Sequence, residues 1–284
     1  MKKGVLVTLA VGEKHQQVFA RVRSTWEAYA ERQGYDLVVY ERPLDPDDKR
    51  SPAWQKLLIL DQPETQDAER VVWMDCDIAI NALKAPDILE AIPPEKVGAM
   101  AHQASLPPLW SQLLAAGVPE IGQALAWREG RPEPECQDRG DYYALYGLDD
   151  PGEAVNTGVL VLSPQHHRQL FAELYKLSGA PDPLNQYEQP YLSHALVARG
   201  LLHPLDRRFN RLWFDEMCAL YPFLLYQDPK DSGWESLVHL SVQAAFTNAY
   251  ALHFAGCVQF LGYWRSDIRD WREFSRLFGQ KSDN

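Results

Sequence analysis

The fold is decided by the stretch Arg70-Val71-Val72-Trp73-Met74-Asp75-Cys76-Asp77-Ile78-Ala79-Ile80. Four apolar residues follow Arg70 without interruption, which is typical of a strand covered on both faces. The run stops at two acids, because an unpaired carboxylate is costly inside a buried strand. Asp75 and Asp77 should therefore lie at the carboxyl end of a strand, where open α/β sheets bind their ligands. Alternation along the strand would turn both acids to one side, where their oxygens can converge on a divalent cation at about 2 Å.

A second Asp-x-Asp motif, Asp45-Pro46-Asp47, serves as an internal control. Its proline and the following Asp48 indicate a polar turn, and no apolar strand leads into it. A solvated turn is the usual explanation of such a motif. The apolar run before Asp75 is what favours a metal site there.

Composition limits the possible functions. The chain has 284 residues, of which 46% are hydrophobic and 24% charged, enough for one large domain or two small ones with a real core. A net charge of −11 argues against duplex nucleic acid as a partner, and a bound phosphate should arrive with a cation. The cysteines show no Cys-x-x-Cys spacing, which favours a reducing compartment. They are Cys76, Cys136, Cys218 and Cys257.

The amino-terminal segment has a basic start and a short apolar stretch, residues 5–11, as a signal peptide does. That stretch runs directly into Gly12-Glu13-Lys14-His15, so we interpret it as a first β-strand. No later segment reaches membrane-spanning length. We therefore expect a cytoplasmic protein.

The first elements predict a parallel sheet. A strand over 4–11, a helix over 14–33 and a strand over 36–41 form a β-α-β unit with a right-handed crossover. The loop after the first strand would then lie beside the ends of the other strands. Thr8 and Ala10 are candidates there for binding a nucleotide base and ribose, with an ordinary strand-to-helix turn as the alternative.

A helix is predicted over 51–60, with Ser51 as its N-cap and Pro52 in its first turn. Lys56 on this helix could reach a phosphate, although an isolated helix lysine is more often solvated. Residues 70–80 are predicted to form one strand that carries the two acids, and a further strand is predicted over 96–101.

Residues 102–153 break this regular pattern with many prolines and glycines. A long irregular insertion in a compact domain is usually functional or mobile. Its aromatic residues could stack on sugar rings as an acceptor-side lid, or could simply pack the insertion onto the body. They are Trp110, Trp127, Tyr142, Tyr143 and Tyr146.

Three later segments carry polar residues that could face a ligand. Asn156-Thr157-Gly158 precedes an apolar strand, and its amide and its glycine suit close contact with a ligand or an ordinary turn. Glu188 and Gln189 stand near the start of a helix, where they could cap it or face the site. His253 lies in a short apolar strand and is either a core residue or a third metal ligand. The segment 263–279 predicts an amphipathic helix that docks on the core or contacts a membrane surface.

Taken together, these motifs resemble nucleotide-sugar glycosyltransferases of the GT-A fold. The resemblance is carried by Trp54-Gln55-Lys56, Asp75-Cys76-Asp77, Asn156-Thr157-Gly158, Glu188-Gln189 and His253-Phe254-Ala255-Gly256-Cys257, in that order. More narrowly, the motifs resemble the family of fungal Golgi α-galactosyltransferases and plant xyloglucan xylosyltransferases, and more distantly the lipopolysaccharide galactosyltransferases and glycogenins. The implied fold is a single α/β domain over 1–284, with a mixed, mainly parallel, Rossmann-like sheet flanked by helices and an irregular helical insertion.

The resemblance also implies a chemistry. A Mn²⁺ or Mg²⁺ ion would be held by Asp75, Asp77 and His253, and Gly256 would contact the donor. Asn156, Glu188 and Gln189 would contact the donor sugar, and the anomeric configuration would be retained. The donor would be a nucleotide sugar, with UDP favoured, and the acceptor a glycan or glycolipid.

One departure stands out: Val258-Gln259 follow where the family usually has a lysine that contacts the diphosphate. Arg265 or Lys56 could replace it, or phosphate neutralisation could rest more on the metal.

Two other function classes compete with the transferase. A nucleotidyltransferase would share the sheet and the acids, but the first turn has no Gly-rich phosphate loop, and neither dinucleotide-binding nor P-loop motifs occur. A catalytically inactive protein that binds sugar nucleotides or glycans is the other alternative, motivated by the missing lysine.

Overall fold

The computed structural model describes residues 4–90, 92–102, 104, 139–177, 179–226, 230 and 233–268. Its main sheet has six strands in the order β2-β1-β3-β6-β5-β7. β2, β1 and β3 run parallel, β6 is antiparallel to both of its neighbours, and β7 is parallel to β5. The mixed, mainly parallel sheet predicted from the sequence is confirmed. The strands are β1 (Val5–Leu9), β2 (Asp36–Tyr40), β3 (Val71–Met74), β5 (Val97–Ala101), β6 (Val155–Leu162) and β7 (Leu202–Pro204).

A second sheet of three short strands lies beside the first, in the order β4-β9-β8. Its strands are β4 (Ile78–Ile80), β9 (Ala251–His253) and β8 (Arg211–Leu212). Residues 70–80 therefore do not form one strand. The chain leaves the main sheet after Met74 and enters the small sheet at Ile78, so that the two acids lie in the turn between the sheets. The apolar pattern on both sides of this turn does not reveal the change of sheet.

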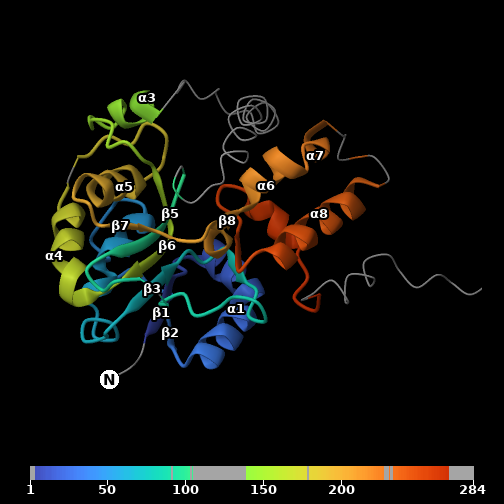
Figure 1. Ribbon diagram of the computed structural model, residues 1–284, viewed down its shortest axis with the longest axis horizontal. Helices are drawn as coiled ribbons and strands as arrows, with labels where there is room; N and C mark the ends of the chain where they lie inside the picture. The colour runs from blue at the N-terminus through green and yellow to red at the C-terminus, as the bar shows by residue number, and fades with distance from the viewer. Residues whose placement is uncertain are drawn as a thin grey trace, which may run out of the picture.

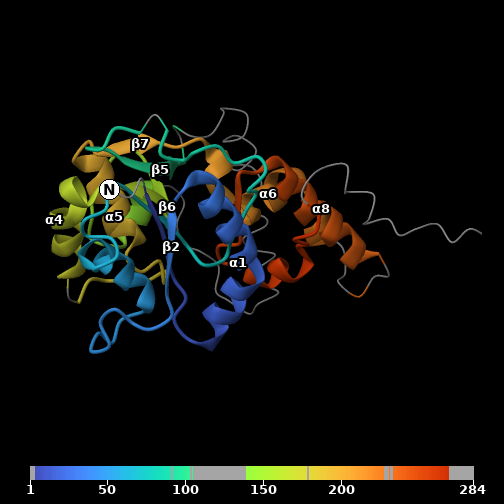
Figure 2. The same cartoon turned by 90° about the horizontal axis from the view of Figure 1, so that it is seen from below.

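Helices cover both faces of the main sheet. Figures 1 and 2 show α1 on one side and α4 and α5 on the other, while α6 and α8 gather beside α1 and the small sheet. The helices are α1 (Glu13–Gln33), η1 (Pro52–Asp61), α3 (Arg139–Ala144), α4 (Pro164–Tyr175), α5 (Gln189–Ala198), η2 (Arg207–Asn210), α6 (Trp213–Leu220), α7 (Phe223–Tyr226), α8 (Trp234–Asn248) and η3 (Val258–Tyr263).

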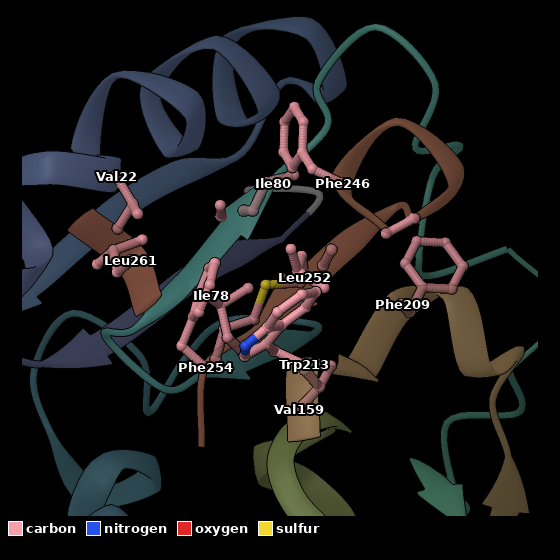
Figure 3. Close-up of a cluster of buried hydrophobic side chains, with 14 of the residues drawn as sticks. Val22, Ile78, Ile80, Val159, Phe209, Trp213, Phe246, Leu252, Phe254 and Leu261 are labelled. Carbon is pink, nitrogen blue, oxygen red and sulfur yellow. The ribbon is translucent and has the colours of Figure 1, made fainter. Parts of the chain in front are cut away.

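Alternation along the strands divides the core into two clusters. In β3, Val72 and Met74 face the cluster made with α1, α6 and α8, whereas Val71 and Trp73 face the cluster made with η1, α4 and α5. Figure 3 shows the first cluster, where Ile78 of β4 and Leu252 of β9 lie among buried aromatic rings. The strand that follows Asp77 and the strand that carries His253 are thus anchored in one hydrophobic core.

Several predicted elements differ in detail. The helix predicted over 51–60 is the 3₁₀ helix η1, and Ser51 caps it by accepting a hydrogen bond from the backbone N–H of Ala53 at 3.3 Å. The strand predicted around His253 ends at that residue. For the tail, residues 263–268 are described, and the remainder of the predicted amphipathic helix lies outside the described residues.

The described part of the insertion packs onto the body. Tyr143 is fully buried and shares a hydrogen bond of 2.7 Å with Ser193 of α5, and the ring of Tyr146 packs edge-on against Tyr191. Tyr143 and Tyr146 therefore pack the insertion onto the body, which is the second of the two interpretations offered from the sequence. Trp110 and Trp127 lie outside the described residues. Among the helices that the structure describes, none is both long and apolar enough to cross a membrane.

Candidate functional site

Asp75 and Asp77 lie in the turn that connects β3 of the main sheet to β4 of the small sheet. The backbone N–H of Asp75 donates to the carbonyl of Gly158 at 2.8 Å, which fixes the turn against β6. The backbone N–H of Ile78 donates to the carbonyl of Asp75 at 3.2 Å and closes the turn. Asp75 and Asp77 are thereby held at the carboxyl end of β3, the end predicted for ligand binding.

His253 reaches the acids from the far end of the sequence. It is the last residue of β9 and pairs with Ile78 of β4. Its Nε2 lies 3.2 Å from Asp77 Oδ1 and 3.7 Å from Asp75 Oδ2. One ligand atom from each of the three residues lies within 4.8 Å of the others. The structure therefore brings together the three residues proposed as metal ligands.

The imidazole and the two carboxylates of this cluster stabilise each other's charges. Burial by itself would lower the pKa of His253, but the carboxylate of Asp77 outweighs it, and the pKa is raised. Burial would likewise raise the pKa of Asp77, but His253 outweighs it, and the pKa is lowered. In the absence of a cation, a proton on the imidazole compensates the acids. A metal ion and that proton would compete for Nε2 of His253.

The donor set fits a divalent metal. Ligand atoms that share one ion at about 2.1 Å lie roughly 3 to 4 Å apart, which matches the separations of His253 Nε2 from both carboxylates. Two carboxylates and one imidazole suit Mn²⁺ and neighbouring divalent metals. The imidazole is buried, whereas the side chain of Asp75 is 34% exposed, so the cluster remains open on one side to a ligand.

Asn210 and Gly158 contact the imidazole on the side away from the acids, and Asn156 orients Asn210. Nδ1 of His253 is 2.8 Å from Oδ1 of Asn210, whose amide nitrogen donates to Oδ1 of Asn156 at 2.8 Å. The same Asn156 oxygen accepts the backbone N–H of Gly158 at 2.9 Å. Gly158 also lies directly against the ring, since a Cβ there would come within 2.3 Å of Cε1 of His253.

Lys56 is part of the site and is not solvated. Its Nζ lies 2.6 Å from Glu188 Oε1 and 3.3 Å from Asp75 Oδ1, and the side chain is only 5% exposed. Burial opposes its charge, but Asp75 and Glu188 outweigh burial and raise the pKa of Lys56. The ammonium thus links Glu188 to the acid that would hold the metal.

Glu188 and Gln189 meet the Asn156-Thr157-Gly158 segment. The carboxylate of Glu188 accepts hydrogen bonds from Lys56 and from the hydroxyl of Thr157, the latter at 3.1 Å. Its pKa is raised by burial, which Lys56 offsets only in part. Gln189 accepts the backbone N–H of Thr157 at 3.2 Å and donates to Gln186 at 2.9 Å.

The remaining predicted residues lie less directly in the site. Thr8 and Ala10 are both fully buried, and the Thr8 hydroxyl has no hydrogen-bond partner within the described part of the chain. Their side chains therefore offer no surface to a nucleotide. Gly256 is exposed with a φ of +66°, three residues beyond His253. Arg265 is paired with Asp267 at 2.8 Å.

Sequence reasoning missed two supporting residues. Asn210 lies at the end of η2, in a segment with no recognisable motif, and its role depends on partners 43 and 54 residues away. Trp73 donates from its indole N–H to Asp75 Oδ1 at 2.9 Å. Only its position two residues before Asp75 hinted at that contact, because residues i and i+2 share one face of a strand.

Comparison with known proteins places the fold. No protein-family model matches the sequence, and no curated protein matches it significantly. A solved glycosyltransferase involved in glycosylation of the major capsid of PBCV-1 superposes with a TM-score of 0.51 at 14% identity, covering 92% of this chain and 100% of that one. The galactosyltransferase LgtC, solved with donor and acceptor sugar analogues, gives a TM-score of 0.44 at 15% identity and covers 98% and 96%. The bifunctional glycosyltransferase WbbM gives 0.49 at 12% identity and covers 99% and 50%. The chain has the fold of a glycosyltransferase, as its motifs predict.

Proposed function

We propose that this protein is a metal-dependent glycosyltransferase that moves a sugar from a nucleotide-diphosphate donor, with UDP favoured, to a hydroxyl of a glycan or glycolipid. One observation carries the proposal. Asp75 and Asp77 lie in one turn and His253 follows almost 180 residues later, yet their ligand atoms converge within 4.8 Å at the carboxyl end of β3. A buried histidine packed only for stability would not need two carboxylates at its Nε2.

The three residues would hold Mn²⁺ or Mg²⁺. Such an ion, when bound, neutralises the charge that develops on the departing diphosphate. Asp75 would remain tied to Lys56 and Trp73 through Oδ1, which leaves Oδ2 on the side of His253. The protein thus presents a fixed set of ligand atoms before any ligand arrives, which lowers the cost of ordering them.

Lys56 supports the acids of the site. It shares its charge between Asp75 and Glu188, so the buried carboxylate of Glu188 has a charged partner. It therefore has little capacity to replace the diphosphate-binding lysine, and Arg265 is already paired with Asp267. Phosphate neutralisation in this protein should depend mainly on the metal.

We infer that Glu188 and Gln189 position the donor sugar. One oxygen of Glu188 accepts from Lys56 and Thr157, which makes that oxygen a weak nucleophile. Gln189 is oriented by Thr157 and Gln186, so its amide has a defined direction. This arrangement favours a front-face substitution that retains the anomeric configuration over a covalent intermediate through Glu188.

The function is tested by nucleotide release. Purified protein is incubated with a panel of nucleotide sugars with and without Mn²⁺, and free nucleotide is measured after hydrolysis or transfer. We expect release from at least one donor, dependent on Mn²⁺, and thermal stabilisation by that donor in the presence of the ion. Asp77→Asn should abolish release, whereas Asp47→Asn, in the other Asp-x-Asp motif, should not.

The alternatives give different outcomes. Stabilisation by a nucleotide sugar without any release would indicate a binding protein. Release of pyrophosphate from a nucleoside triphosphate and a sugar phosphate would indicate a nucleotidyltransferase. The absence of any metal-dependent effect on all donors would refute the proposal.

A further inference from the structure

The hydrogen bonds behind His253 have a direction that is fixed by the backbone. The N–H of Gly158 can only donate, so the Asn156 atom that it meets at 2.9 Å is the carbonyl oxygen. That oxygen must also receive the second contact of Asn156, at 2.8 Å from Asn210, and the Asn210 atom facing it must be the amide nitrogen.

The direction continues to the imidazole. With its nitrogen turned to Asn156, Asn210 presents its carbonyl oxygen to Nδ1 of His253 at 2.8 Å. A carbonyl oxygen can only accept, so Nδ1 must carry a hydrogen. In the neutral imidazole the lone pair is then on Nε2, the atom that lies 3.2 Å from Asp77. All three side chains are at least nine-tenths buried, so water does not offer an alternative set of partners.

We propose that Asn156 and Asn210 form a positioning relay, anchored on the backbone of Gly158, that selects the His253 tautomer able to bind a cation through Nε2. The inference deepens the proposed function and rests on its metal site. It assigns Asn156 a second task besides contact with a donor sugar. Because its oxygen already accepts two hydrogen bonds, Asn156 would offer a ligand only its amide N–H groups.

The tautomer of His253 depends on which way the amide of Asn210 is turned. If Asn210 turned its amide by 180°, its nitrogen would face Nδ1 of His253, and the hydrogen of the neutral ring would move to Nε2. An N–H on Nε2 cannot bind a metal. The oxygen of Asn156 is what prevents this turn, because two oxygens would then face each other at 2.8 Å without a hydrogen between them.

The tautomer can be read directly by long-range ¹H–¹⁵N NMR on histidine-labelled protein, without metal, above the pH at which the ring titrates. The His253 signals are identified as those missing in His253→Gln. We expect the Nδ1–H tautomer in the wild type and a shift toward Nε2–H in Asn156→Leu, although Asn156 does not touch the ring. Asn156→Asp retains an acceptor oxygen and should keep the Nδ1–H tautomer.

Metal affinity provides the second readout. Mn²⁺ binding, followed by the EPR signal of the free ion, should weaken about 10- to 100-fold in Asn156→Leu and in Asn210→Leu, as for other partners of metal-ligating histidines. Asn81→Leu is the matched control, because Asn81 is equally buried but donates to the carbonyl of Phe246. It should bind Mn²⁺ as the wild type does.

The two proposals fail in different ways. If folded Asn156→Leu keeps both the Nδ1–H tautomer and wild-type Mn²⁺ affinity, the relay is refuted while the metal site stands. If the wild type binds no Mn²⁺, the metal site is refuted, and the NMR comparison still decides whether the relay sets the tautomer.

Discussion

Gly158→Ala should damage the candidate metal site by displacing the imidazole of His253. A Cβ at this position would lie 2.3 Å from Cε1 and 2.8 Å from Nδ1 of His253, and 2.9 Å from Oδ1 of Asn156. Non-bonded carbon atoms prefer about 3.5–4.0 Å, so the ring must move by roughly 1 Å or more. Metal–ligand distances tolerate only about 0.2 Å. The variant should therefore lose at least about tenfold in Mn²⁺ affinity.

Two measurements on Gly158→Ala check this reasoning. Mn²⁺ affinity is determined by EPR or calorimetry, and urea denaturation determines stability, which should fall by about 1–3 kcal/mol because the added methyl overpacks the core. Gly233→Ala is the matched control, since a Cβ there meets nothing within 4 Å. A folded Gly158→Ala protein that binds Mn²⁺ within twofold of the wild type would contradict the close packing of glycine and ring.

Three further changes test the charges of the molecule. Burial lowers the pKa of His253, but Asp77 outweighs burial and raises it above 6.5. As the pH is lowered, the ring should therefore bind a proton, and Mn²⁺ affinity should start to decrease, before pH 6.5 is reached, with a loss of about tenfold per pH unit below the pKa. Calorimetry with proton release measures this, and a pH-independent affinity would contradict it. Lys56→Met should lower the free energy of unfolding by up to about 3–5 kcal/mol, and the loss should grow as the pH rises above 4.5, because without Lys56 the buried Glu188 stays protonated in the folded protein while it ionises in the unfolded chain; urea denaturation across this range tests it, and an unchanged midpoint would refute the buried pair. Asp48, whose pKa is lowered from 3.8 to about 2 chiefly by a hydrogen bond from a nearby arginine, should contribute up to about 2 kcal/mol above pH 3.8 that is lost as the pH falls toward 2, so Asp48→Asn should differ from the wild type near pH 6 and converge with it at acid pH.

The sequence was sufficient for the elements whose pattern is local. The unbroken apolar run before Asp75 predicted both a buried strand and the end of the sheet at which the acids lie, because strand burial and the cost of buried carboxylates act within a few residues. It did not reveal that the chain changes sheets between Met74 and Ile78, since both sides of the turn are equally apolar. The two acids do converge, but they do so because they lie in the turn between the two sheets and not because they alternate along one strand.

Side-chain partners far apart in sequence were harder to predict. Lys56 could be placed on a helical segment but not among its partners, because Thr157 and Glu188 follow it by 101 and 132 residues. Asn210 carried no signal at all, since an asparagine that orients a histidine has the same local sequence as one in any turn. These contacts depend on the packing of whole elements, which local patterns do not specify.

The most direct measurement of the central claim is anomalous X-ray scattering at the manganese absorption edge, from crystals soaked with Mn²⁺ and a nucleoside diphosphate. We expect one strong peak between Asp75, Asp77 and His253, with Nε2 of the imidazole facing the ion. A structure with the diphosphate bound and no manganese peak among these three residues would contradict the account.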